Sequence, residues 1–253
     1  MMTMSQHLSL RSGNPTLAGE TFRGEHVLRG EAVMTVQGTV NKAFLALAVL
    51  MVAAGYTWNL GPADPRVGTF TTLGVLGGLL AALVTTFRPT FAPITAPIYA
   101  ALEGLALGGI SVVFEARYPG LVVQAVFLTF ATLGALLLAY RSGLVRVTEN
   151  FKLGVVAATG GIMLVYLIGW VMSLFGRGLP LIHGSGTFGI VFSLVVVAVA
   201  AFNLVLDFDF IEQGAEQGAA KYMEWYGAFA LLVTLVWLYL EMLRLLSKLQ
   251  ERR

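Results

Sequence analysis

Seven apolar segments, each about as long as a bilayer crossing requires, occupy most of the chain between residues 43 and 249. A hydrocarbon core of about 30 Å needs roughly 20 apolar residues per crossing helix, so this repeated length constrains the fold more than any single motif. The expected spans are residues 43–60, 67–87, 91–115, 120–140, 152–175, 187–207 and 225–246. A helix is the only open-chain structure that satisfies its own backbone groups in lipid. The sequence therefore predicts an all-α, polytopic membrane protein with a bundle of seven transmembrane helices.

Composition supports this class and argues against several others. Hydrophobic residues make up 57% of the chain and charged residues 12%, whereas soluble domains carry roughly 25% charged residues. The net charge of +2 gives no support to a nucleic-acid partner. We expect the lipid bilayer to be the main partner and other membrane proteins to be further partners. The chain has no cysteine, which excludes disulfides and thiolate catalysis. We expect neither an enzyme nor a cofactor.

Loop composition predicts the domain boundaries and the orientation. Residues 1–40 are polar and are expected to form a disordered cytoplasmic tail without a cleavable signal, followed by a transmembrane domain at 41–249 and a basic tail at 250–253. The N-terminal side of the membrane would hold nine lysines and arginines and the opposite side three, which predicts a cytoplasmic N-terminus. The two sets are Arg11, Arg23, Arg29, Lys42, Arg88, Arg141, Arg146, Lys152 and Lys221, against Arg66, Arg117 and Arg177.

The C-terminal basic residues leave the last segment's topology open. Arg244, Lys248, Arg252 and Arg253 lie on the opposite side if this segment crosses the membrane, and on the N-terminal side if it re-enters. The short loops and the lack of cysteine fit a bacterial inner membrane.

Small residues and prolines predict two local features. Gly74/Gly78 and Ala100/Gly104/Gly108 recur at four-residue spacing, which permits close approach between helix backbones. Pro93 and Pro97 fall at the start of the third segment, so we expect regular helix there to begin only near Ile98.

The acids at the end of the sixth segment are the sharpest polar feature. Asp207 follows the apolar run directly, and Asn203 lies one helical turn before it on the same face. Two interpretations remain open: Asp207 ends the span at the headgroup level, or its carboxylate turns into the bundle, where burial penalises the charged form. Asp209, Glu212 and Glu216 share a different, polar stripe that is typical of a solvated helix end.

Two further acids lie within apolar segments. Glu241 either pairs with Arg244 three residues later or shares a proton with Asp207, in which case protonation would hold the helices together and ionisation would release them. Glu103 follows Tyr99 by one turn and fits a structural hydrogen bond as well as a pore-lining role. Such oxygen ligands suit a hard cation such as Ca²⁺ or a proton path rather than zinc or copper.

The last fifty residues resemble the C-terminal signature of the Bax inhibitor-1 family, the transmembrane Bax-inhibitor-motif proteins, in its bacterial branch. The resemblance rests on Leu206-Asp207 through Ile211-Glu212, on Glu216, Gly218 and Tyr222, and on the run Leu240-Glu241-Met242-Leu243-Arg244-Leu245-Leu246. The approach Met34-Thr35-Val36 to Lys42 and the run Glu103-Gly104-Leu105-Ala106-Leu107-Gly108 are similar to the same branch.

The resemblance implies a central last helix and a pH-sensitive calcium leak gated by two aspartates on the last two helices. The first aspartate falls on Asp207 and the second on Glu241, which marks this pair as a candidate Ca²⁺ region, with Ca²⁺ as the permeant ion. The second acid is Glu rather than Asp, and the interval between the two is longer than is usual in the family, so Asp209 is an alternative sensor. Arg88 is the candidate for the family's second-helix arginine, and Glu103 is a further candidate pore or gate partner.

Two functions from different classes follow. The first is a passive, proton-regulated calcium leak. The second is a non-conducting interaction protein that modulates other membrane proteins or a membrane protease, with the acids fixing the packing only. The acids do not recur in corresponding halves of the chain, which gives no support to a transporter with internal repeats.

Overall fold

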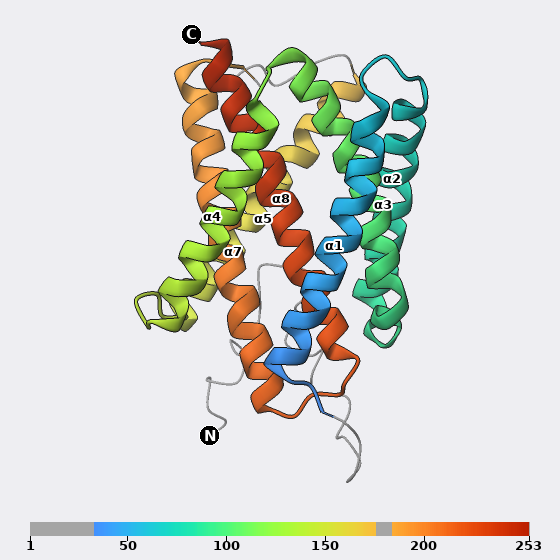
Figure 1. Ribbon diagram of the computed structural model, residues 1–253. Coiled ribbons are helices and arrows are strands. Elements are labelled where there is room, and N and C mark those ends of the chain that lie inside the picture. The colour runs from blue at the N-terminus through green and yellow to red at the C-terminus, as the bar shows by residue number, and fades with distance from the viewer. Residues whose placement is uncertain (1–32, 176–183, 253) are drawn as a thin grey trace. The chain divides into compact units, whose positions relative to one another are not determined.

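A computed structural model of the protein describes residues 33–175 and 184–252 (Figure 1). Within these residues, seven helices are long and apolar enough to cross a membrane, and the only strand-like pairing is one isolated antiparallel bridge, between Val33 and Ala220. The expected all-α polytopic bundle is therefore confirmed. The expectations for most of the N-terminal tail, including Arg11, Arg23 and Arg29, and for Arg177 and Arg253, lie outside the described residues.

Each expected span corresponds to a helix. The elements are α1 (Val36–Leu60), α2 (Arg66–Phe87), the short 3₁₀ helix η3 (Pro89–Phe91), α3 (Ala92–Arg117), α4 (Leu121–Arg141), α5 (Glu149–Leu174), α7 (Thr187–Glu216) and α8 (Met223–Glu251). The last two helices extend past their expected ends because hydropathy marks only the membrane-crossing part, whereas the helix continues into polar sequence. An uninterrupted α8 of 29 residues is long enough to cross the membrane completely.

The expected late start of regular helix near Ile98 is wrong. The α3 helix begins at Ala92, directly after η3, and contains Pro97. Pro93 falls in the first turn, where a backbone N–H has no acceptor within the helix, so its ring costs little there. Pro97 removes one hydrogen bond just after this turn, a loss that membrane helices tolerate.

The described residues divide into two compact units. Residues 33–122 and 207–233 are called the N-terminal unit, and residues 123–175, 184–206 and 234–252 the C-terminal unit. The helices α7 and α8 contribute residues to both. The expected division into a tail, one transmembrane domain and a basic end stays a prediction.

In the N-terminal unit, α3 packs closely against both α1 and α2 (Figure 1). A Cβ atom at Gly104 would collide with the backbone oxygen of Leu50, and one at Gly108 with that of Ala54. Gly74 on α2 approaches the α3 backbone in the same way. The predicted close approach at small residues is thus present, and it brings helix backbones together without intervening side chains.

In the C-terminal unit, α5, α7 and α8 contribute to one apolar core. Its centre is Ile162, Val196 and Val199, and the residues packed against it are Ala158, Tyr166, Phe192 and Trp237. The apolar window of α8 is 61% buried, as is that of α7, whereas those of α4 and α5 are 22% buried. The two last helices are equally buried, so the central last helix that the resemblance implies stays a prediction.

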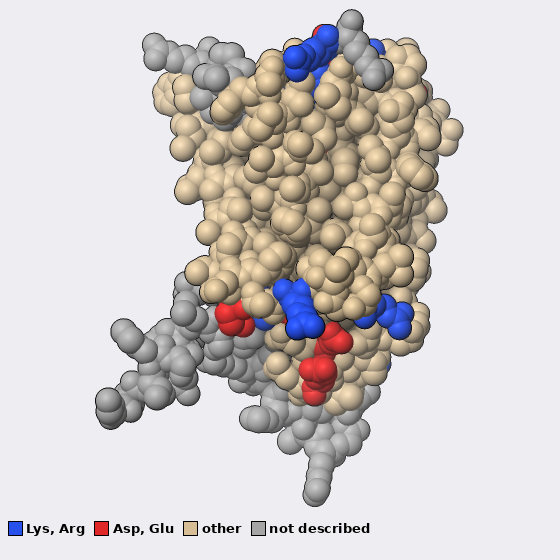
Figure 2. Space-filling model, turned by 90° about the vertical axis from the view of Figure 1, so that its left-hand side faces the viewer, with Lys and Arg blue, Asp and Glu red and all other residues tan. Residues whose placement is uncertain are grey.

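The outward side chains have the character of a lipid-facing surface. Val52 on α1 is 75% exposed, and Phe127 and Leu138 on α4 are each 71% exposed. On the face in Figure 2, the lysines, arginines and acids of the described residues appear only toward the two ends, with a broad uncharged stretch between them. This distribution is expected where hydrocarbon surrounds the helices.

Candidate functional site

Asp207 lies inside the protein rather than on its surface. Its exposed fraction is 0%, and α7 continues beyond it to Glu216. Asn203, one turn earlier, is 1% exposed and donates from its side-chain amide to Thr159 Oγ1 at 2.8 Å. The α7 helix therefore carries two successive buried polar groups on one face. An ionised carboxylate at such a position within a membrane span is costly in free energy. We therefore treat Asp207 as a candidate functional residue.

The neighbouring acids lie in a different environment. Asp209 is half-buried and accepts a hydrogen bond from Gln213 Nε2 at 2.6 Å. Glu212 and Glu216 are exposed. This is the arrangement of a polar helix end, so burial distinguishes Asp207 from Asp209, and the choice of Asp209 as an alternative sensor stays a prediction.

Glu241 lies in the C-terminal unit and is 1% exposed. Its Oε1 accepts from Tyr166 Oη at 2.8 Å and from Arg244 Nη1 at 2.6 Å. The Arg244 guanidinium also stacks over the Tyr166 ring, 5.2 Å from its centre. Glu241 Oε2 has no hydrogen-bond partner among the described residues. The i+3 ion pair considered from the sequence is present, with the acid buried and the arginine partly exposed.

Asp207 belongs to the N-terminal unit and Glu241 to the C-terminal unit. A proton shared between them, and a Ca²⁺ region at the pair, therefore stay predictions. Within the ranges that the structure describes, no group of three or more His, Cys, Asp or Glu is placed to hold a metal ion.

The two predicted partners of the gate lie elsewhere in the N-terminal unit. Glu103 on α3 is half-buried, and a Cβ at Gly78 would lie 2.8 Å from its Oε2, so the carboxyl group lies against the glycine surface of α2. Tyr99 is buried and packs edge-to-face on Phe229. Arg88 is exposed at the end of α2, and none of the ion pairs among the described residues includes it.

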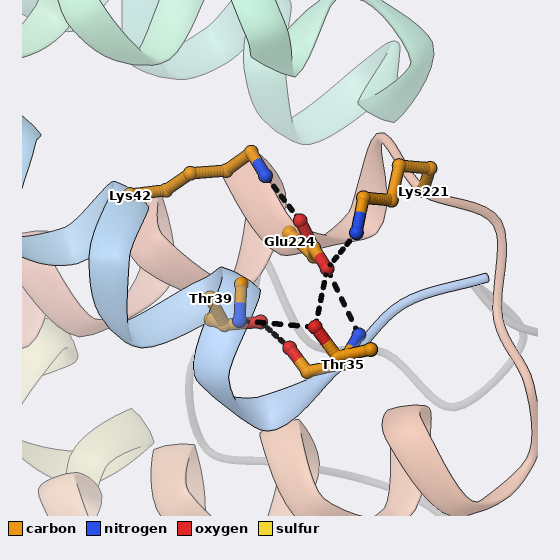
Figure 3. A network of polar contacts seen from close by, with 6 residues as sticks. Thr35, Thr39, Lys42, Lys221 and Glu224 are labelled. Atoms are coloured by element: carbon orange, nitrogen blue, oxygen red, sulfur yellow. Dashed lines mark hydrogen bonds and ion pairs between the residues drawn. The ribbon is translucent and has the colours of Figure 1, made fainter. Parts of the chain in front are cut away.

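A polar network around Glu224 was missed from the sequence. Figure 3 shows the carboxylate of this residue, in the first turn of α8, between Lys42 of α1 and Lys221 of the preceding loop. Glu224 Oε1 accepts from Lys221 Nζ at 2.7 Å and from Thr35, through its backbone N at 2.9 Å and its Oγ1 at 2.8 Å. Glu224 Oε2 accepts from Lys42 Nζ. The Glu224 side chain is 0% exposed, so this acid is fully satisfied inside the N-terminal unit.

The local sequence explains how α1 reaches this network. Thr35 is the N-cap of α1, and its Oγ1 also accepts from the backbone N of Gly38. Gly38 has no side chain at the point where a Cβ would collide with the Glu224 carboxylate. A sequence signal existed: a lysine opens the first span and an acid opens the last, both on the predicted cytoplasmic side.

A second missed cation lies near the end of α8. Lys248 is 4% exposed, and its Nζ donates to Ser193 Oγ at 2.8 Å and to the backbone oxygen of Gly189 at 3.0 Å, both on α7. Lys248 was counted from the sequence among the basic residues that follow the last span. In the structure its side chain is buried in the C-terminal unit.

The seven apolar helices of the described residues, with buried carboxylates on the last two, define an integral, polytopic α-helical membrane protein. Residues 14–251 match the protein-family model described as Bax inhibitor 1 like. The chain belongs to this family, which confirms the resemblance found in the sequence. Neither a curated protein nor a solved structure gave a significant match to the chain.

Proposed function

We propose that this protein is a pH-sensitive passive cation leak with Ca²⁺ as the permeant ion, in a bacterial inner membrane with its N-terminus in the cytoplasm. The observation that carries the proposal is Asp207, a carboxylate that is 0% exposed within a membrane-spanning helix. A buried titratable acid in such a place changes the free-energy balance between two packings when its proton leaves. Family membership supports the same function.

The proposed mechanism uses protonation as the gate. Protonated Asp207 is compatible with the closed, buried arrangement, whereas its ionised form favours an arrangement that admits water or a cation. Glu241 is the second acid of the gate, because its Oε2 is buried and lacks a hydrogen-bond donor among the described residues. Carboxylate oxygens suit a hard cation such as Ca²⁺. Glu103 and Arg88 remain proposed pore or gate partners.

Calcium flux into proteoliposomes between pH 6 and pH 8 tests this function. We expect flux in the wild type to change with pH, and Asp207→Asn and Glu241→Gln to lose that dependence while remaining folded. No flux above empty liposomes at any pH, with inserted and folded protein, would overturn the proposal.

Asp64 provides a matched control acid. It lies in the loop between α1 and α2, and the side-chain hydrogen bonds from Arg66 lower its pKa below the usual value for Asp. Asp64 is therefore ionised throughout pH 6 to 8, and it takes up a proton only in more acidic solution. We expect Asp64→Asn to keep the pH dependence of the wild type.

The second candidate function is a non-conducting interaction protein. The hydrogen bond of Asn203 to Thr159 and the ion pair of Glu241 with Arg244 favour it, because buried polar groups can serve packing alone. In that case Asp207→Asn and Glu241→Gln would lower thermal stability or partner binding, and no variant would alter flux.

A further inference from the structure

Glu224 joins the start of α1 to the start of α8. This contact is separate from the proposed pH sensor at Asp207. Thr35, Gly38, Lys42, Lys221 and Glu224 are called here the α1–α8 clamp (Figure 3). We propose that the clamp holds the closed state, so that the start of α8 must separate from α1 before the leak opens. This inference rests on the proposed leak function.

The bonding within the clamp makes it act as one unit. Four donors converge on a single carboxylate, three from the start of α1 and one from the loop before α8, and three of the four bond to the same oxygen, Oε1. Hydrogen bonds to an ionised carboxylate are roughly twice as strong as neutral ones. Because Glu224 is the common acceptor, its neutralisation weakens all four contacts together.

Two glycines let α1 and α8 pack closely at the clamp. Gly38 lets α1 approach so closely that a Cβ there would collide with the Glu224 carboxylate. One turn of α8 further on, a Cβ at Gly227 would lie 3.1 Å from Thr39 of α1 and 3.2 Å from Ile211 of α7. A shift of α8 along α1 at this end would therefore disturb both the clamp and the side-chain packing at these two glycines.

A short backbone pairing extends the clamp outward. Val33 and Ala220 form an isolated antiparallel bridge, and Met34 N donates to Ala219 O at 2.7 Å. This bond joins the residue after Val33 to the residue before Ala220, so the bridge pair itself is non-hydrogen-bonded. In such pairs the Cα atoms are about 4.5 Å apart, within the range that a disulfide spans.

The bridge permits a reversible lock. The chain has no cysteine, so the double variant Val33→Cys/Ala220→Cys carries the only two thiols. We expect the oxidised protein to show at least a fivefold lower calcium flux at the most permissive pH than the same sample after reduction, with each single variant like the wild type. Equal flux in the oxidised and reduced samples, at complete disulfide formation, would overturn the proposal.

Release of the clamp gives the opposite result. We expect Glu224→Gln to raise the flux at least threefold at every pH and to leave the ratio between the pH extremes unchanged, because Asp207 is intact. Glu216→Gln is the matched control, since Glu216 is an exposed acid at the nearby end of α7. A flux in Glu224→Gln equal to that of this control would contradict a closing role.

A labelling assay separates failure of the clamp from failure of the leak. Thr39 is 1% exposed, and its Oγ1 donates to the backbone oxygen of the clamp residue Thr35. The rate at which Thr39→Cys reacts with a maleimide therefore reports the opening of the clamp. We expect this rate to rise at least tenfold when Glu224→Gln is added. An unchanged rate would refute the clamp whatever the flux. If the labelling rate rises but the wild type shows no calcium flux, Glu224 still holds α8 against α1, and the leak function is refuted.

Discussion

The glycines at the helix contacts of the N-terminal unit differ in their surroundings from those on α5 of the C-terminal unit. In the N-terminal unit, the space beside Gly74, Gly104 and Gly108 is filled by the backbone of a neighbouring helix. In the C-terminal unit, Gly154 and Gly161 on α5 have no atom within 4 Å of where a Cβ would stand. Glycine therefore serves close packing at these three positions of the N-terminal unit, whereas Gly55 and Gly68 of the same unit face open space as the two α5 glycines do.

In the C-terminal unit, side-chain hydrogen bonds between helices take the place of close backbone packing at glycines. There α5, α7 and α8 are joined by polar side chains: Asn203 with Thr159, Glu241 with Tyr166, and Lys248 with Ser193. In lipid, helices associate through van der Waals packing and interhelical hydrogen bonds rather than through the hydrophobic effect. The N-terminal unit depends mainly on van der Waals packing, apart from the clamp and the hydrogen bond from Thr85 of α2 to Thr95 of α3, and the C-terminal unit depends more on interhelical hydrogen bonds.

The largest expected effect breaks the backbone packing. Gly104→Val places side-chain atoms against the Leu50 oxygen, which cannot move without shifting α1, so we expect a loss of about 3 kcal/mol. Gly161→Val, at an exposed position of the C-terminal unit, should change stability by less than about 0.5 kcal/mol. Thermal unfolding of both variants in the same detergent measures the difference. Similar losses in the two would show that the units do not differ in this respect.

A smaller effect is expected from the polar contacts of the C-terminal unit. Arg244→Met removes the cationic donor to the buried Glu241 and should cost about 2 kcal/mol, less than for a fully buried pair because Arg244 is partly exposed. Arg141→Met is the control, an exposed arginine at the end of α4. Chemical unfolding in mixed micelles checks the prediction, which fails if both variants unfold at the same denaturant concentration.

The smallest effect concerns a single hydroxyl group. Tyr166→Phe keeps the ring under Arg244 and removes the hydroxyl group that donates to Glu241 and accepts from Arg244, so we expect a loss of about 1 kcal/mol. Combined with Arg244→Met, the two losses should not add, because both donors serve the same Glu241 oxygen. Strict additivity of the unfolding free energies would argue against a shared network.

The sequence predicted the spans well because bilayer thickness imposes a length that hydropathy detects. It placed the start of α3 incorrectly because Pro97 normally disfavours helix, whereas a membrane helix tolerates the loss of one backbone hydrogen bond. It also ended α7 and α8 too early, since their final turns are polar.

The residues of the candidate site were harder to predict from the sequence than the membrane spans were. Asp207 and Glu241 were selected because an acid within an apolar run is conspicuous, and both are buried. Glu224 was missed because it lies at the edge of a span, where an acid is ordinary, and its partner Lys42 is 182 residues away in the chain. Lys248 was missed for the same reason: only tertiary packing shows that a terminal lysine contacts Ser193 rather than water.

The partners of the last helix have a consequence for biogenesis. Arg244 contacts Tyr166 of α5, and Lys248 contacts Ser193 of α7, so both cations are matched by groups that are synthesised earlier. Placing such charges in the hydrocarbon alone costs up to about 3 kcal/mol each at the centre of a helix. We therefore expect the final segment to insert more readily when α5 and α7 are already in the membrane to receive its two cations.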